Sequence, residues 1–156
     1  MTGRSITQED LAELVARVRE ATGALIRGDV RRYLALVPSA EDYTLMPPTG
    51  GETRHGFDSS AESIDALESF FAGAGEGDFD LEESYVSGNL AVLVGVERQR
   101  GVVGGLPDQD WSLRVTLVFR REDSEWRLAH RHADALVHPI GMEQLSQLAR
   151  GSGPPD

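Results

Sequence analysis

The chain has 156 residues, enough for one domain with a sizeable core, and it contains no cysteine. The absence of cysteine excludes disulfide bonds, thiolate metal ligands and cysteine nucleophiles. The formal net charge of -11 disfavours nucleic acids and anionic membranes as partners, because both carry negative charge.

Neither a membrane segment nor a leader is apparent in the sequence. No apolar run approaches the roughly 20 residues that a spanning helix needs. Residues 1–10 lack the basic and then apolar order of a signal peptide. These features predict a cytoplasmic protein.

The first half of the chain is predicted to be mainly helical. Helices are expected over residues 11–26, 30–37 and 60–71, with short strands over 42–46 and 53–57. Thr7, Asp29 and Ser59 have the side chains of helix N-caps. Gly28 and Pro38 are typical of the ends of the first two helices.

The second half is predicted to be rich in strands. Residues 79–86 and 90–100 form one antiparallel pair, and residues 111–121 and 125–134 form a hairpin with its turn at Asp123-Ser124. A terminal helix is expected over residues 139–150.

The order of these elements predicts an α+β fold in which a curved antiparallel sheet wraps over about three helices. Such a sheet leaves a conical cavity between itself and the helices. One domain is expected over residues 6–150, and residues 151–156 are predicted to be a disordered tail.

The hairpin carries a polar cluster. With the turn at Asp123-Ser124, a regular register places Trp126 and Leu128 on the apolar face, followed on that face by His130, His132 and Asp134. A carboxylate on an apolar face loses hydration, so its pKa is expected to rise toward the working range of a general acid or base. The predicted catalytic residues are therefore Asp134, with His132 and His130 as groups that orient it or a ligand.

Three passages resemble a known family: EDYTLMPPTGG, RHGFDSSAESIDALESFF and RVTLVFRREDSEWRLAHRHAD. Together they resemble the SnoaL-like group of the nuclear transport factor 2-like superfamily over nearly the whole chain. The resemblance implies the cystatin-like α+β roll. The last passage also resembles the end of the association domain of calcium/calmodulin-dependent kinases, a member of the superfamily that assembles and binds small acids.

The resemblance allows the catalytic positions of the family to be compared one at a time. The ketosteroid isomerases carry an aspartate and a tyrosine where this chain has Pro47 and Ala21, which disfavours that chemistry. The aspartate of the SnoaL-like polyketide cyclases matches Asp134. The passage MEQLSQLARG resembles the tail of those cyclases, although VHPIG is inserted before it.

The predicted ligand-binding residues are aromatic, apolar or basic. They are Tyr43, Met46, His55, Phe70, Phe71, Trp111, Arg114 and Arg131. A bulge in the hairpin would turn Arg114 and Arg131 inward, where they would bind a carboxylate. The H-x-H pattern with Asp134 also suits a metal, but neither a metal nor another cofactor is the expected outcome.

Two functions remain open. The first is a small-molecule pocket protein, a cofactor-free cyclase, isomerase or dehydratase that moves protons on an apolar, carbonyl-bearing substrate. The second is a non-catalytic module that binds a small apolar or acidic ligand or assembles with itself. A homodimer through the outer sheet face is expected in either case, because residues 90–100 and 111–122 carry apolar side chains on both faces.

Overall fold

The computed structural model describes residues 5–71 and 73–151, which fold into four helices and a curved, seven-stranded mixed sheet. The elements in chain order are α1 (Gln8–Ile26), α2 (Val30–Leu36), β1 (Ser39–Met46), β2 (Arg54–His55), α3 (Ala61–Phe70), β3 (Gly75–Ser87), β4 (Leu90–Gly101), β5 (Gln109–Asp110), β6 (Leu113–Glu122), β7 (Glu125–Asp134) and α4 (Met142–Arg150). The predicted α+β class with a curved sheet is confirmed.

The helices begin close to the predicted caps. The Thr7 hydroxyl accepts from the Asp10 backbone N–H at 3.1 Å, and the Asp10 carboxylate accepts from the Thr7 N–H at 2.8 Å, which completes a capping box. Asp29 caps α2 as predicted. Ser60, one residue later than expected, caps α3.

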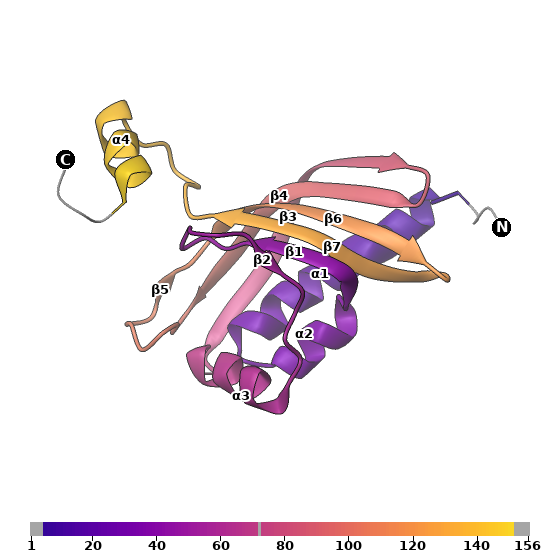
Figure 1. Cartoon of the computed structure of the whole chain (residues 1–156), viewed down its shortest axis with the longest axis horizontal. Helices are drawn as coiled ribbons and strands as arrows, with labels where there is room; N and C mark the ends of the chain where they lie inside the picture. Colours follow the sequence, from indigo (N-terminus) through magenta and orange to yellow (C-terminus); the bar gives the residue numbers. More distant parts are fainter. Residues whose placement is uncertain (1–4, 72, 152–156) are drawn as a thin grey trace.

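The sheet has the strand order β2-β1-β7-β6-β4-β3, with β5 paired to β4 (Figure 1). The sheet is antiparallel as predicted except at one pair, because β1 runs parallel to β7. The alternation of side chains along a strand does not encode the direction of its neighbour, so this pairing was not predictable from the pattern. The hairpin turn lies as predicted at Asp123-Ser124, and both residues have the positive φ of a type I′ turn.

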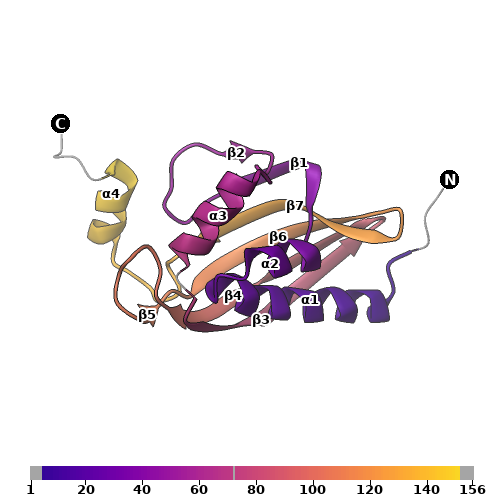
Figure 2. The same cartoon turned by 90° about the horizontal axis from the view of Figure 1, so that it is seen from below.

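The core lies between the concave face of the sheet and the helices α1 and α2, which run along that face (Figure 2). Leu14 and Val18 of α1 pack there against Leu93, Phe119 and Leu128 of the sheet, and all of them are buried. Burial of such side chains is the main favourable contribution to folding.

The C-terminal end differs from the rest of the fold. The predicted terminal helix is present as α4, which lies apart from the sheet and from the other helices in both views (Figures 1 and 2). Apart from Gly151, the predicted tail lies outside the described residues. No helix within residues 5–71 and 73–151 has both the length and the hydropathy to cross a bilayer.

Candidate functional site

A β-bulge in β7 decides which polar side chains enter the fold. Phe119 pairs with Leu128, but Val118 pairs with His130, so Ala129 is the extra residue on β7. Because the bulge reverses the alternation, Arg131 lies on the inner face of the sheet.

The prediction of which hairpin side chains face the core is therefore only partly correct. Trp126 and Leu128 point into the core as expected, whereas His130, His132 and Asp134 lie on the outer face. The bulge that we considered as an alternative is present and turns Arg131 inward. It leaves Arg114 outside, because the extra residue is on β7 and not on β6.

The inner face carries a buried ion pair between Arg131 and Glu97. The two guanidinium nitrogens donate to the two carboxylate oxygens at 2.6 and 2.7 Å, and the side chains are only 10% and 7% exposed. Bidentate pairs of this kind are short, charge-assisted and geometrically specific. Glu97 was not among the predicted site residues. The alternation Ala91, Leu93, Gly95, Glu97 along β4 could have placed it on the buried face.

Two tyrosines lie in the electrostatic field of this pair. Burial raises the pKa of the Tyr33 phenol, an effect that Arg131 partly offsets. Burial likewise raises the pKa of Tyr43 far above its usual value. Burial lowers the pKa of Arg131, but the charge and hydrogen bonds of Glu97 raise it more, so the net pKa lies above the usual value. Both phenols stay neutral and Arg131 stays charged at physiological pH.

The space around this cluster is nearly filled. An interior gap of about 10 Å³ remains beside Tyr33, Glu97 and Arg131, under the side chains of α1 and α2. That volume accommodates about one water molecule. Small-molecule pockets usually measure about 300–1,000 Å³. The predicted conical cavity is thus occupied by the protein's own side chains at this position.

Asp134 lies on the outer face in a second ion pair. Its carboxylate accepts from the Arg114 guanidinium at 3.0 and 3.1 Å and from the Leu136 backbone N–H at 2.8 Å. Burial raises the pKa of Asp134, but these hydrogen bonds lower it more, and the net pKa lies below the usual value. The expected rise in pKa was wrong, because Asp134 pairs with a cation and is partly exposed.

The two histidines are neighbours of Asp134 on this face. The Nδ1 atom of His130 lies 2.7 Å from the Thr44 hydroxyl, and the His130 and His132 rings are 6.5 Å apart. His132 and Asp134 line an open groove of about 410 Å³, which runs over β4 and β6. Among the residues described by the structure, no cluster of three histidine or acidic side chains is arranged to hold a metal ion.

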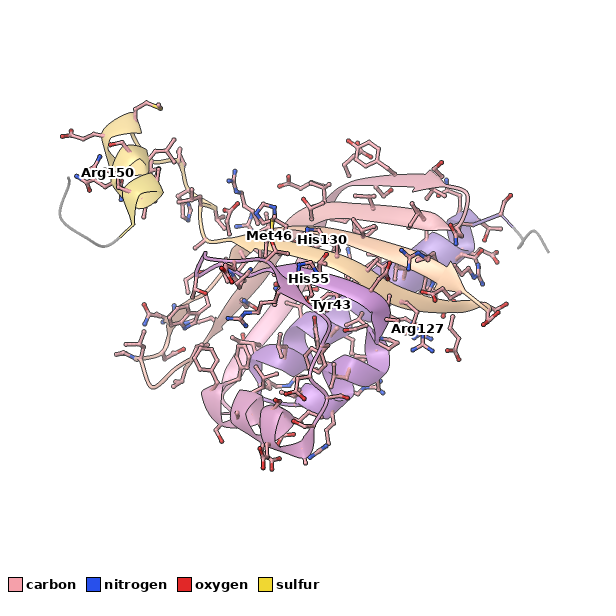
Figure 3. The ribbon with its side chains drawn as sticks, viewed as in Figure 1. Tyr43, Met46, His55, Arg127, His130 and Arg150 are labelled. Carbon is pink, nitrogen blue, oxygen red and sulfur yellow. The ribbon has the colours of Figure 1, made fainter. Side chains whose placement is uncertain are left out.

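The other predicted ligand-binding residues fall into separate groups. Met46 and His55 lie near His130 (Figure 3), because Met46 pairs with His132 and His55 pairs with Thr44, which contacts His130. Tyr43 is buried in the core, Met46 lies on the outer face, and His55 is exposed on β2. Phe70 is 48% exposed, and Phe71 packs against it edge to face. The Trp111 indole N–H donates to the Gly101 carbonyl at 3.0 Å, which holds the loop beside β4.

The family assignment follows from the sequence. Residues 14–137 match the family described as SnoaL-like domain. The chain belongs to this family. The predicted SnoaL-like assignment is therefore confirmed, and the predicted fold is shared with solved structures described as nuclear transport factor 2-like. No curated protein matches the sequence significantly.

Solved structures share the fold at low identity. A candidate calcium/calmodulin-dependent protein kinase II association domain from Xanthomonas campestris is 20% identical, with a TM-score of 0.61 over 88% of this chain and 96% of that one. A nuclear transport factor 2-like protein with a cystatin-like fold from Novosphingobium aromaticivorans is 21% identical, with a TM-score of 0.58 over 90% and 97%. A candidate dehydratase of the nuclear transport factor 2-like family from Streptomyces avermitilis is 22% identical, with a TM-score of 0.58 over 83% of this chain and 96% of that one. Such similarity establishes a fold and not an activity.

Proposed function

We propose that this SnoaL-like domain is a non-catalytic module that forms a homodimer through the outer face of its sheet. The observation that carries the proposal is an apolar patch on that face, which we call the outer stripe. It consists of Tyr85, Leu90, Val92, Val94 and Val118.

The outer stripe is only partly covered within one chain. Tyr85 is 59% exposed and Leu90 is 38% exposed, while the three valines are half-buried. The outer face of a monomeric antiparallel sheet is usually polar, whereas contiguous exposed apolar residues mark interaction surfaces. A two-fold interface would cover the same stripe on both copies.

Charged residues surround the outer stripe. Arg120 pairs with Asp42, Arg98 pairs with Asp80, and Arg114 pairs with Asp134. An apolar centre with a polar rim is the usual anatomy of a protein–protein interface. The structure described as an association domain from Xanthomonas campestris is consistent with an assembling role for this fold.

Two further observations, on the interior cavity and on Asp134, also support a non-catalytic role. The nearly filled cavity leaves no room for a substrate beside Arg131, and the Asp134 carboxylate is held by Arg114 at a low pKa. A general acid or base needs a pKa near the working pH. Proton transfer by Asp134, with His132 and His130, therefore stays an untested prediction with less support than assembly.

Two neighbouring residues of β3 provide a matched test of the dimer. Tyr85 belongs to the outer stripe, whereas Val86, which is 44% exposed, points to the opposite face of the sheet in the strand register. We expect Tyr85→Glu to shift sedimentation at micromolar concentration toward the monomer, and Val86→Glu to leave the dimer intact. Equal sedimentation of the two variants would contradict an interface on the outer stripe.

A second candidate function is the binding of a small carboxylic acid by Arg131. It is favoured by the bidentate pair, because Glu97 already occupies the guanidinium in the way a ligand carboxylate would. An acid would have to displace Glu97 and expand the gap of about 10 Å³.

Chemical rescue tests this candidate. If the site accepts external acids, formate or acetate should raise the melting temperature of Glu97→Gln more than that of the wild type, because the acid replaces the missing carboxylate. Glu83→Gln, on the outer face, is the control and should respond like the wild type. Identical responses of all three proteins would exclude Arg131 as an acid receptor.

A further inference from the structure

The outer face of β1 and β7 carries nitrogen and sulfur ligands that the outer stripe does not include. His130 and His132 alternate on β7 and share this face. On β1, Thr44 is the register partner of His130, and Met46 is the register partner of His132. Because neighbouring strands lie about 4.8 Å apart, the Met46 side chain leaves the sheet next to that of His132. Figure 3 shows Met46 and His130 beside each other at this place.

The spacing of the two imidazoles is close to that of two ligands of one ion. The ring centres of His130 and His132 are 6.5 Å apart, and the ring planes meet at 61°. Two imidazoles on opposite sides of an ion have ring centres roughly 6 Å apart, because each metal–nitrogen bond measures about 2.0–2.1 Å. The His132 side chain is exposed, so a small rotation of its ring closes the difference.

The hydroxyl of Thr44 orients one of these rings. The Nδ1 atom of His130 lies 2.7 Å from the Thr44 Oγ1 atom. Metal-binding histidines use their second ring nitrogen in a hydrogen bond of this kind, which fixes the ring and its tautomer. When Nδ1 donates its proton to the hydroxyl, Nε2 presents its lone pair to an ion. His55 pairs with Thr44 from β2, so the β1 strand separates it from His130.

The third ligand determines which ion the pair would bind. Within residues 5–71 and 73–151, no three histidine or acidic side chains are placed to hold an ion, and the neighbour that remains is the Met46 thioether, on a side chain that is 41% exposed. Zinc is bound by thiolate, imidazole and carboxylate, whereas a thioether is a soft ligand that favours Cu(I). The formal net charge of -11 also attracts a cation.

We propose that His130, His132 and Met46 form a binding site for a Cu(I) ion on the outer face of the sheet. The two histidines supply nitrogen ligands, Met46 supplies sulfur, and Thr44 is a positioning residue that holds the His130 ring. The site is independent of the proposed homodimer, because its ligands lie on β1 and β7, whereas the outer stripe lies on β3, β4 and β6.

Competition with the chromophoric chelator bicinchoninate, without oxygen, measures the Kd of the whole chain for Cu(I). His132→Ala and Met46→Leu should each weaken binding by about tenfold or more, because loss of even an outer partner of a metal ligand costs 10–100-fold. The controls His138→Ala and Met142→Leu change the same residue types at exposed positions elsewhere and should stay within about twofold. A wild type that does not compete for Cu(I), or equal losses in controls and ligand variants, would overturn the site.

The role of sulfur is tested separately. X-ray absorption at the copper edge should show a sulfur neighbour in the wild type and none in Met46→Leu. Zinc is the second probe, and Met46→Leu should leave its affinity unchanged. A copper spectrum with nitrogen and oxygen neighbours only, or a zinc affinity that depends on Met46 as strongly as the Cu(I) affinity does, would overturn the assignment to Cu(I).

Two threonines on either side of β7 test the positioning role. Thr44 contacts His130 from β1, and Thr116 is the register partner of His132 on β6. Thr44→Val keeps the shape of the side chain but removes the hydroxyl, and it should weaken Cu(I) binding by about tenfold. Thr116→Val should leave the Kd within about twofold. Equal Kd values for the two variants would contradict the role of Thr44.

Discussion

At the scale of single residues, the Arg131–Glu97 pair is a buried polar contact of the interior. Both side chains are almost fully buried, and each satisfies the other through two short hydrogen bonds. A buried ion pair contributes little relative to a well-packed apolar pair, but removal of one partner leaves a charge without compensation.

Glu97→Gln should therefore lower the free energy of unfolding by about 3–5 kcal/mol. The double variant Glu97→Leu/Arg131→Met should lose clearly less than Arg131→Met and Glu97→Gln combined, because it leaves no buried charge. Urea unfolding monitored by circular dichroism gives these values. As a control, Asp80→Asn breaks the exposed Arg98–Asp80 pair and should change stability by less than about 1 kcal/mol. A small effect of Glu97→Gln would show that the interior is hydrated.

Asp134 determines a pH dependence at the same scale. Its folded-state pKa lies below the usual value of about 3.9, so its contribution to stability is present above that pH and is lost as pH falls through the folded pKa. The difference in melting temperature between wild type and Asp134→Asn should therefore be constant from pH 7 to 5 and shrink below pH 4. A difference that grows on acidification would mean that the folded pKa is raised.

At the scale of elements, Gly95 of β4 sets how closely β3 approaches. A Cβ atom at this position would lie 2.8 Å from the Phe79 ring and even closer to the Asp80 carbonyl. Gly95→Ala should cost about 1–3 kcal/mol, because a well-packed core does not accept an added methyl group without strain. Gly141→Ala, which meets no atom within 4 Å, should change stability by less than about 0.5 kcal/mol. Differential scanning calorimetry of both variants measures the two changes in stability. Equal melting temperatures would contradict the close approach of β3 to Gly95.

Local signals account for the elements that the sequence predicts well. The Thr7–Asp10 capping box, Asp29 and the Asp123-Ser124 turn each act within a few residues, and all three appear as expected. The bulge at Ala129 has no comparable local signal, because it depends on how β7 pairs with both β6 and β1. One extra residue reversed the orientation of everything after it, which is why Arg131 and Asp134 exchanged faces relative to the prediction.

At the scale of the whole molecule, the formal net charge of -11 per chain opposes association of two copies. If the outer stripe provides the attraction, added salt should strengthen the dimer, because the Debye length falls from about 10 Å at 0.1 M to about 3 Å at 1 M. Sedimentation equilibrium at those two concentrations of sodium chloride should give a lower Kd at high salt. A dimer that dissociates in salt would instead be held by the charged rim.

The mass of the wild-type protein in solution tests the central claim most directly. One chain has a mass of 17.0 kDa, and a sheet-to-sheet homodimer has twice that mass. Multi-angle light scattering at micromolar concentration should report the doubled mass. A single species of 17.0 kDa under the same conditions would contradict the account of this chain as a homodimerising module.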